Sequence, residues 1–438
     1  MSPTILNMTT SCGNIDTCSK AAANFLGYAS LKQEQATVIN QFLFGKDVFA
    51  VLPTGFGKTL CYACLPLVFD AVLGTDRSIV VVISPLVSIM KDQTDTFNKR
   101  GLAAAFVSGD QNNEVVLKGV KAGAYKLVFF TPEMLLLNKH WRCLLKSDVY
   151  ASNICALVID EAHTVKKWGD SFRKVMQRIV EVRSLIPPSV HMMCLTATAT
   201  KSLREEVIAI LGMKSPEVIA VSPSKLNITF MIKKFDNIQE AFSPLVSGLL
   251  KQRGEFPRTI IYCQRLPECG RIYRHLRYCL GKQFTEPVDA PDLPEFRLVD
   301  MFHSSVDVEI KEYILKSFTK PSHLRVVIAT VAFGMGIDCN DVHQVFHVGP
   351  PEDIECYIQE TGRAGRDGDK SLALLMLIKE IRMIHIDPSM RNYIKSSTCR
   401  RDCLFQNFEG YNPIKSTPCL CCDVCSLGQC EELQQFSI

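Results

Sequence analysis

A lysine and a threonine close a glycine-rich turn near the start of the chain, in the run Pro53-Thr54-Gly55-Phe56-Gly57-Lys58-Thr59. An apolar run precedes this turn and a helical pattern begins at Leu60, which is the strand–turn–helix context of a phosphate-binding loop. The backbone N–H groups of such a turn and the helix dipole favour phosphate. Lys58 would reach the β- and γ-phosphates and Thr59 would hold Mg²⁺. Leu52 stands where the general pattern has its first glycine, so an ordinary turn before a helix is the alternative.

Two acids close a later apolar run, where Asp160 and Glu161 follow Ala156-Leu157-Val158-Ile159. Carboxylates at the end of a buried strand are costly unless they meet a cation or handle a proton. Asp160 would hold Mg²⁺ through its water shell, and Glu161 would activate the attacking water as a general base. Alone, this pair also fits solvated acids at a strand end. After a phosphate-binding loop it indicates hydrolysis of a nucleoside triphosphate.

The stretch Leu31-Lys32-Gln33-Glu34-Gln35 precedes the loop. The amide of Gln35 has the donor and acceptor that adenine's edge requires, although the stretch also fits an exposed helix face. The predicted ATP-binding residues are therefore Lys32, Gln35, Thr54, Gly55, Phe56, Gly57, Lys58, Thr59 and Asp160.

These residues are positioned by short, apolar, β-branched runs that alternate with longer helical patterns. Such runs are typical of buried parallel strands with helical crossovers, and two series of them predict two α/β lobes. Pro216 and Pro223 interrupt the pattern, and after about Ile381 the alternation stops. We therefore predict lobe 1 over residues 1–217, lobe 2 over 218–380 and a small cysteine-rich domain over 381–438. The predicted strands are 47–52, 78–83, 126–130, 156–160, 191–196, 259–263, 297–303, 325–330, 344–349 and 372–378.

Composition excludes few classes of function. Of the 438 residues, 47% are hydrophobic and 21% are charged, which argues against a largely disordered chain. The net charge of +4 neither requires nor excludes nucleic acid. No apolar run reaches the roughly 18 residues of a membrane span, and the polar first twenty residues predict no secretory signal. Most of the 19 cysteines are expected to be reduced thiols.

The cysteines near the C-terminus are an exception, because seven of them fall in residues 399–438. The pairs Cys419/Cys422 and Cys422/Cys425 have the spacing with which two thiolates bind one tetrahedral Zn²⁺. The alternatives are a disulfide or plain buried thiols. Cys403 remains a further candidate ligand. A site of four cysteines would serve folding rather than catalysis.

In their order, Gln35, the phosphate-binding loop, Asp160–His163 and Thr196-Ala197-Thr198 resemble the motifs of superfamily 2 helicases. The runs 331–338 and 359–368 (Gln-Glu-Thr-Gly-Arg-Ala-Gly-Arg-Asp-Gly) resemble those of the RecQ family of DNA helicases, and this family tolerates an apolar residue at position 52. The resemblance covers roughly residues 25–425, the helicase core and the zinc-binding domain. It implies two RecA-like lobes with ATP between them, and translocation in the 3′ to 5′ direction that unwinds DNA in repair, recombination and replication. It also implies a monomer in the nucleus, or in the cytoplasm of a bacterium.

The resemblance assigns Gln359, Arg363 and Arg366 of lobe 2 to the γ-phosphate. A guanidinium fork matches the charge that spreads over the phosphoryl oxygens in the transition state. The alternative is a pair of surface arginines bound to Glu360 or Asp367. The predicted catalytic residues are thus Glu161, Asp160, Lys58, Gln359, Arg363 and Arg366.

Residues 164–173 resemble the aromatic-rich loop with which RecQ helicases sense single strands, although Asp170-Ser171 stand where the family more often has His-Asp. Trp and Phe side chains stack on unpaired bases, but they also serve as core anchors. The predicted DNA contacts are Ser84, Ser88, Gln93, Trp168, Phe172 and Arg173. Aligned on Cys-Arg-Arg, the family's zinc ligands would be Cys399, Cys419, Cys422 and Cys425.

Three readings compete with a DNA helicase: an RNA helicase, a duplex translocase that does not unwind, and a non-catalytic DNA-binding adaptor. The adaptor would carry a damaged loop or acid pair, yet Lys58, Asp160 and Glu161 are all present. The tail and the run 359–368 favour the DNA helicase.

Overall fold

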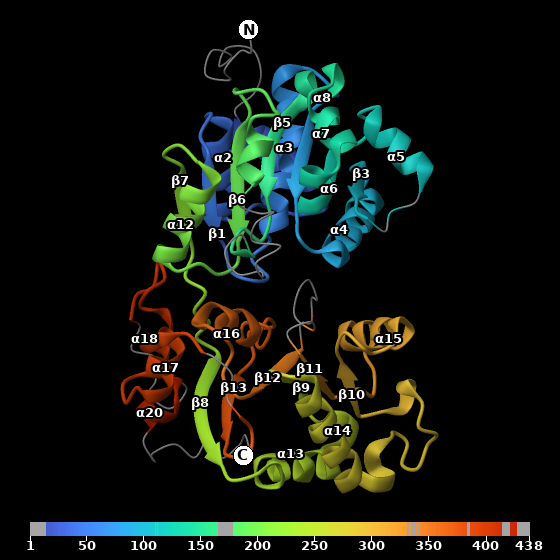
Figure 1. The fold of residues 1–438 in the computed structure, drawn as a ribbon, viewed down its shortest axis with the longest axis vertical. Helices are drawn as coiled ribbons and strands as arrows, with labels where there is room; N and C mark the ends of the chain where they lie inside the picture. The colour runs from blue at the N-terminus through green and yellow to red at the C-terminus, as the bar shows by residue number, and fades with distance from the viewer. Residues whose placement is uncertain are drawn as a thin grey trace. The chain divides into compact units, whose positions relative to one another are not determined.

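The structure, a computed structural model, describes residues 15–109, 111, 113–164, 178–330, 333, 339, 341–382, 386–413 and 421–426. It divides into two compact units (Figure 1). The first comprises Met1–Ser222 with Phe408–Gly410, and the second comprises Pro223–Asn407 with Tyr411–Ile438. Strand β7 (Glu217–Ala220) of the first sheet crosses the predicted boundary after residue 217. The second unit takes in most of the region for which a third domain is predicted.

The first unit is built on a parallel sheet in the order β3-β4-β2-β5-β6-β1-β7. Adjacent residues of its strands feed two hydrophobic clusters: Val48 and Ala50 of β1 belong to one, and Phe49 and Val51 to the other. The strands are therefore buried on both faces, as the continuous apolar runs predict. The remaining strands are β1 (Val48–Val51), β2 (Ile79–Ile83), β3 (Ala104–Val107), β4 (Leu127–Phe130), β5 (Ile154–Ile159) and β6 (His191–Thr196). The helices are α1 (Ile15–Phe25), α2 (Gln33–Leu43), α3 (Lys58–Leu73), α4 (Val87–Lys99), α5 (Glu114–Lys121), α6 (Pro132–Leu137), α7 (Lys139–Leu145), α8 (Asp148–Asn153), α11 (Ile179–Arg183) and α12 (Lys201–Leu211).

The second unit repeats this plan with a parallel sheet in the order β10-β11-β9-β12-β13-β8. Its strands are β8 (Ile228–Phe235), β9 (Arg258–Cys263), β10 (Val299–Phe302), β11 (Val326–Ala329), β12 (Val342–Val348) and β13 (Ser371–Ile378). The α-helices are α13 (Ile238–Gln252), α14 (Leu266–Leu280), α15 (Val308–Thr319), α16 (Ile354–Thr361), α17 (Pro388–Lys395), α18 (Arg400–Phe405) and α20 (Asp423–Ser426), and short 3₁₀ turns are η2 (Arg253–Glu255), η3 (Gly281–Phe284) and η4 (Pro294–Phe296). Two parallel sheets confirm the predicted α/β class.

The order of the first sheet decides where its chemistry gathers. Strands β5, β6 and β1 are neighbours, and the carboxyl ends of parallel strands meet at one edge of a sheet. The glycine-rich turn follows β1, the acid pair follows β5, and Thr196 ends β6. The N–H of Leu52 donates to the carbonyl of Thr196 at 2.9 Å, and the N–H of Ala162, just after β5, donates to the carbonyl of Leu195 at 2.9 Å, so the ends of β1 and β5 are both joined to the end of β6.

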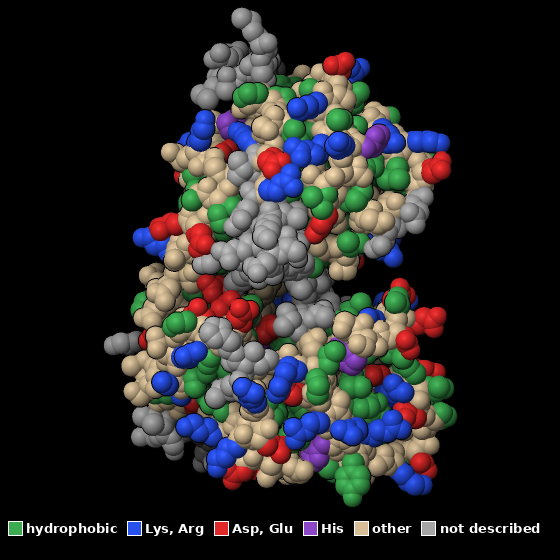
Figure 2. Space-filling view, viewed as in Figure 1, with side chains coloured by type: hydrophobic (Ala, Val, Ile, Leu, Met, Phe, Trp, Pro, Cys, Tyr) green, Lys and Arg blue, Asp and Glu red, His purple; other side chains and the backbone are tan. Residues whose placement is uncertain are grey.

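One face of the molecule shows how the charged side chains of the described residues are distributed (Figure 2). On the face shown in Figure 2, basic and acidic side chains are interspersed over both units, which agrees with the net charge of +4. Among the described helices, none has the length and apolar character needed to cross a membrane.

Candidate functional site

The glycine-rich turn has the backbone that its sequence predicts. Gly55 and Gly57 have φ of 80° and 88°, in the left-handed region that glycine adopts at no steric cost. A Cβ on Gly57 would lie 2.6 Å from Nε2 of Gln35, so a side chain there would displace the Gln35 amide. Lys58 is the first residue of α3. The turn therefore presents a helix N-terminus, its N–H groups and a lysine at one point, which suits a phosphate.

Gln35 and Lys32 lie against this turn. The Gln35 amide donates to the carbonyls of Phe56 and Gly57 at 3.0 and 3.1 Å, and its oxygen accepts from the Lys32 N–H at 2.8 Å. The Lys32 ammonium stands 4.2 Å from the centre of the Phe56 ring. The predicted adenine-reading group thus holds the phosphate loop in this structure, and contact with adenine stays a prediction.

Thr59 is joined to helix α4 through Gln93. The Gln93 amide donates to Oγ1 of Thr59 at 3.2 Å, and its oxygen accepts from the Tyr62 hydroxyl at 2.6 Å. Burial raises the pKa of Tyr62 well above its ordinary value, so the phenol stays a donor. Gln93 is a predicted DNA contact, yet here its side chain is engaged with the predicted Mg²⁺ ligand.

The acid pair lies at the end of β5. The Asp160 N–H donates to the Ile83 carbonyl at 2.9 Å, and Asp160 Oδ1 accepts from the Glu161 N–H at 3.0 Å. Burial, with the neighbouring charge of Glu161, raises the pKa of Asp160 to about 7, whereas Lys58 acts to lower it. A buried carboxylate in this state fits a divalent cation, which would offset its desolvation.

Glu161 has φ of 50°, a left-handed conformation that is uncommon for residues other than glycine and is concentrated at functional sites. The next turn holds it: both the N–H and the hydroxyl of Thr164 donate to the Glu161 carbonyl at 2.9 Å. Its Oε2 lies 3.3 Å from Nδ1 of His163, which is also 3.0 Å from Oγ1 of Thr196. The acid is thereby linked to the Thr-Ala-Thr run after β6.

The predicted arginine residues lie in the second unit, in and after helix α16. Gln359 is within this helix, and Arg363 and Arg366 follow its end at Thr361. Arg363 is buried, with an exposed fraction of 6%. Gly365 has φ of 60°, and a Cβ there would lie 2.2 Å from the Asn227 amide. We call residues 362–366 the arginine turn.

The predicted DNA contacts have different environments. Ser88 is exposed on α4, whereas Ser84 is fully buried after β2 and its hydroxyl has no hydrogen-bond partner among the described residues. Trp168, Phe172 and Arg173 lie outside the described residues. Among the predicted DNA contacts that the structure describes, Ser88 is therefore the one whose side chain is exposed and could meet a strand.

Four cysteines gather in the second unit. The sulfur atoms of Cys399, Cys421, Cys422 and Cys425 lie within 4.8 Å of one another, and the Cys399 and Cys421 sulfurs are 3.4 Å apart. Four thiols at this spacing fit a tetrahedral Zn²⁺. The set contains three of the four predicted ligands, and Cys421 takes the fourth place. Cys419 lies outside the described residues, and Cys403 does not belong to the group.

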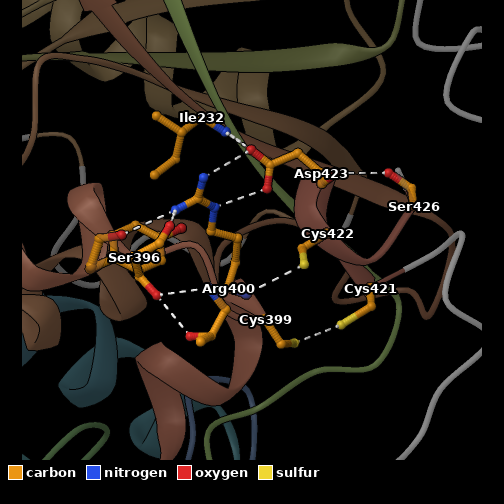
Figure 3. Close-up of polar contacts among 10 residues, drawn as sticks. Ile232, Ser396, Cys399, Arg400, Cys421, Cys422, Asp423 and Ser426 are labelled. Atoms are coloured by element: carbon orange, nitrogen blue, oxygen red, sulfur yellow. Dashed lines mark hydrogen bonds and ion pairs between the residues drawn. The ribbon is translucent and has the colours of Figure 1, made fainter. Parts of the chain in front are cut away.

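Hydrogen bonds around Arg400 attach this cluster to the lobe (Figure 3). Its backbone N–H donates to the Cys422 sulfur at 3.3 Å, and its guanidinium pairs with Asp423 at 2.9 Å. Asp423 also accepts from the N–H of Ile232 in β8 at 3.1 Å. The cysteine cluster is therefore part of the same packed unit as the arginine turn.

Sequence reasoning missed two residues near the arginine turn. Lys225 lies just after Pro223, in a stretch that reads as a linker, and its ammonium donates to the carbonyls of Gly362 and Ala364 at 2.7 and 3.1 Å. Arg401 reads as part of the Cys-Arg-Arg run, and its buried guanidinium donates to the Lys225 carbonyl at 2.6 Å. No local sequence pattern predicts either contact.

Comparison with known proteins places these features in a family. Residues 32–206 match the DEAD/DEAH box helicase family, and residues 240–368 match the helicase conserved C-terminal domain. The ATP-dependent DNA helicase RecQ of Haemophilus influenzae is 31% identical over 91% of this chain. A putative ATP-dependent RNA helicase of Acanthamoeba polyphaga mimivirus, R290, is 29% identical over 91% of this chain and 70% of its own length. This chain spans only 62% of the Haemophilus protein.

The fold is similar to that of solved helicase structures. The crystal structure of the DUF1998 helicase MrfA bound to DNA matches 85% of this chain and 52% of its own, with a TM-score of 0.67 and 19% identity. At that identity the likeness concerns the fold alone, and it confirms two RecA-like lobes.

Proposed function

Because this chain belongs to the RecQ family of superfamily 2 helicases, we propose that it is an ATP-dependent helicase that moves 3′ to 5′ along single-stranded DNA and unwinds duplex DNA. The observation that carries the proposal is the meeting of the phosphate loop and the acid pair at one sheet edge, where Lys58 influences the pKa of Asp160. Repair, recombination and replication of chromosomal DNA are the proposed settings, in the nucleus or, in a bacterium, the cytoplasm. The chain is proposed to act as a monomer.

The chemistry of the first unit is proposed as follows. The loop N–H groups and Lys58 bind the phosphates of ATP, and Glu161 accepts a proton from the attacking water. Mg²⁺, held through Thr59 and Asp160, would neutralise charge on the phosphate oxygens. The strained backbone of Glu161 and its contact with His163 support a fixed orientation for this base.

Arg363 and Arg366, with Gln359, are proposed to complete the reaction from the second unit. An arginine that meets the transition-state charge contributes roughly 10³–10⁵ in rate. Since these arginines and the phosphate loop belong to different units, hydrolysis requires that the units close on the nucleotide. This requirement would tie each turnover to a step along the strand.

For the DNA contacts, we propose that Trp168 and Phe172 stack on bases while Arg173 and Ser88 bind the backbone. For the cysteine cluster, we propose a structural Zn²⁺ held by Cys399, Cys422, Cys425 and either Cys421 or Cys419. Their thiolates and the hydrogen bonds of Arg400 would hold α18 to α20, and the hydrogen bond that Asp423 accepts from Ile232 would hold α20 to β8. Such a site contributes to folding and supplies no catalytic step.

The test is ATP hydrolysis by the purified chain alone, with single-stranded DNA and with single-stranded RNA. We expect strong stimulation by DNA and separation of duplexes that carry a 3′ overhang, but not of those with a 5′ overhang. The Lys58→Ala variant should lose hydrolysis while it keeps single-strand binding. Robust turnover by that variant, or unwinding from the 5′ overhang, would refute the assignment.

An RNA helicase is the second candidate, and the similarity to the mimivirus protein named as a putative RNA helicase favours it. Stimulation by RNA that equals or exceeds stimulation by DNA would select this candidate.

A further inference from the structure

The side chain of Lys225 brings a positive charge to the backbone carbonyls of the arginine turn. Its ammonium donates to the carbonyl of Gly362, the cap residue that directly follows α16, and to that of Ala364. Carbonyls at a helix C-terminus lack intrahelical partners and attract cations. These two carbonyls flank Arg363 on either side in the chain. A single side chain thus holds the backbone from which Arg363 projects.

The Lys225 ammonium lies in an environment that disfavours its positive charge. Burial lowers the pKa of Lys225 to about 8, and the charges of Arg366 and Arg363 act in the same direction, whereas Asp367 opposes them. A surface lysine would avoid such a cost. The two carbonyl contacts are the compensation that the structure provides, so the position of the ammonium depends on the arginine turn, and the turn depends on the ammonium.

Asn227, two residues after Lys225, also binds this loop. Asn227 donates through its side-chain amide to the carbonyls of Gly365 and Asp369 at 3.0 and 2.8 Å. Gly365 has φ of 60°, which disfavours a side chain there, and a Cβ would also displace this amide. Residues 225 and 227 together therefore hold four backbone carbonyls of the loop from 362 to 369.

Arg401 fixes the segment that carries these two residues. Its guanidinium is buried, with an exposed fraction of 1%, and donates to the Lys225 and Ile228 carbonyls at 2.6 Å each. It also donates to the Ser224 hydroxyl at 3.1 Å and stands 5.4 Å from the centre of the Phe230 ring. Because Arg401 follows Cys399 by two residues, the cysteine cluster and the arginine turn are joined through one short segment.

We propose that Lys225 is a positioning residue for the catalytic arginine Arg363, and that Arg401 holds the segment from which Lys225 acts. The inference rests on the proposed function, since it assumes that Arg363 meets the phosphate. Lys225 would act through the backbone carbonyls that it binds rather than on the nucleotide. It sets the backbone of the arginine turn, and a displacement of about 1 Å at a reacting group costs about 10²-fold in rate.

The test compares hydrolysis by Lys225→Met, Arg363→Ala and the double variant of the full chain with single-stranded DNA. We expect Lys225→Met to lower kcat by about 10- to 100-fold and to leave the KM for ATP within about twofold. The double variant should be no slower than Arg363→Ala alone, because Lys225 acts through that arginine. Single-turnover measurements are used for the Arg363→Ala and double variants, whose hydrolysis is expected to be slow. Lys234→Met, at an exposed position of β8, is the matched control and should behave as the parent.

Each outcome decides between the two claims. An inactive parent, or Arg363→Ala with parental turnover, refutes the proposed function itself. A parental rate in Lys225→Met, or a double variant whose losses multiply, overturns the inference and leaves the proposed function standing. Should Lys225→Met fail to fold, Asn227→Ala replaces it in the same cycle, with a smaller loss of kcat expected and the same non-additivity required.

Discussion

The side-chain amide of Gln93 lies 3.2 Å from Oγ1 of Thr59, and the same side chain accepts from the buried hydroxyl of Tyr62. Helix α4 is therefore joined to the first turn of α3 through the residue that is proposed to hold Mg²⁺. Since Ser88 lies exposed on the same helix, α4 has one side chain directed to the nucleotide site and another open to a strand.

The Gln93→Glu variant should weaken the response to Mg²⁺. A carboxylate still accepts from Tyr62, but it cannot donate to Thr59. One lost hydrogen bond is worth about 1 kcal/mol, so we expect the Mg²⁺ concentration for half-maximal hydrolysis to rise about fivefold. Single-strand affinity should be unchanged. Ser88→Ala is the matched variant: it should weaken single-strand binding and leave the Mg²⁺ dependence of hydrolysis unchanged. A Gln93→Glu chain with parental Mg²⁺ dependence and weaker DNA binding would restore Gln93 to the set of DNA contacts.

The Asp160→Asn variant should be more stable than the parent at pH 8 without nucleotide or added Mg²⁺. The folded pKa of Asp160 is about 7, above the value of about 3.9 in an unfolded chain. The protonated form is therefore favoured on folding. This contribution is complete below about pH 4 and is lost as the pH rises through 7.

Thermal unfolding between pH 5 and 8 tests this. Asparagine stays neutral and keeps an oxygen for the Glu161 N–H, so the melting temperature of the variant should exceed that of the parent at pH 8, and the difference should shrink toward pH 5. Asp95→Asn, at an exposed position of α4, controls for the loss of a surface charge. Equal melting temperatures of Asp160→Asn and parent at pH 8 would contradict the prediction. They would show that other interactions offset the cost of burying the Asp160 carboxylate.

The strands that sequence analysis missed share a position in the fold. Ala104–Val107, Glu217–Ala220 and Ile228–Phe235 each lie at the edge of a sheet, whereas the central strands were predicted within one or two residues. Central parallel strands are covered on both faces and show continuous apolar runs. An edge strand such as β8 carries Lys233 and Lys234, and β7 falls in a stretch flanked by prolines that resembles a linker.

The same distinction holds for the site. The phosphate loop and the acid pair are local patterns whose chemistry depends on adjacent residues, so their types and spacing indicate them. The contact of Lys225 with Gly362 spans 137 positions of the chain. The direction of Gln93 depends on how α4 packs against α3. Only tertiary structure brings such partners together, and it also places the sulfur of Cys421 3.4 Å from that of Cys399, which spacing alone does not predict.

Cysteine substitutions should identify the zinc ligands. The sulfur geometry predicts that Cys421→Ser and Cys422→Ser release the metal to a chelator at least about 10- to 100-fold more readily than the parent does, since loss of a residue that merely orients a ligand already costs that much. Cys403→Ser should bind zinc as the parent does. Metal content by mass spectrometry and competition with a chromogenic chelator measure this. If Cys419→Ser loses the metal while Cys421→Ser retains it, the ligand set implied by the family resemblance is right and the set gathered in this structure is not.

Glu161→Gln should separate binding from chemistry. The amide keeps the size of the side chain but cannot accept a proton, and loss of a general base typically costs 10²–10⁴-fold. We expect kcat to fall by about that factor while binding of a fluorescent ATP analogue stays within about twofold, because the phosphate loop is untouched. Lys58→Ala is the contrasting variant and should lose the analogue as well. Loss of analogue binding by Glu161→Gln would mean that this residue supports the loop rather than the water.

The two tryptophans should report DNA separately. Trp141, in α7, is buried with an exposed fraction of 5% and packs on Phe130, so its emission should not respond to a strand. Trp168 lies outside the described residues and is the predicted stacking side chain. Stacking of a base on an aromatic ring is worth about 1–3 kcal/mol and should quench its fluorescence. We therefore expect single-stranded DNA to quench the parent but not Trp168→Phe.

The hydrolysis of a Trp168→Ala variant completes this test. Its basal rate should equal that of the parent, because the phosphate loop and Glu161 are unchanged, while stimulation by single-stranded DNA should be lost. The aromatic loop follows Glu161 by only a few residues, so a base bound there would act on the acid through the intervening turn. A variant that is stimulated as strongly as the parent would show that Trp168 is a core anchor, and the coupling of DNA to hydrolysis would then have to begin elsewhere, with Ser88 on α4 as the next residue to substitute.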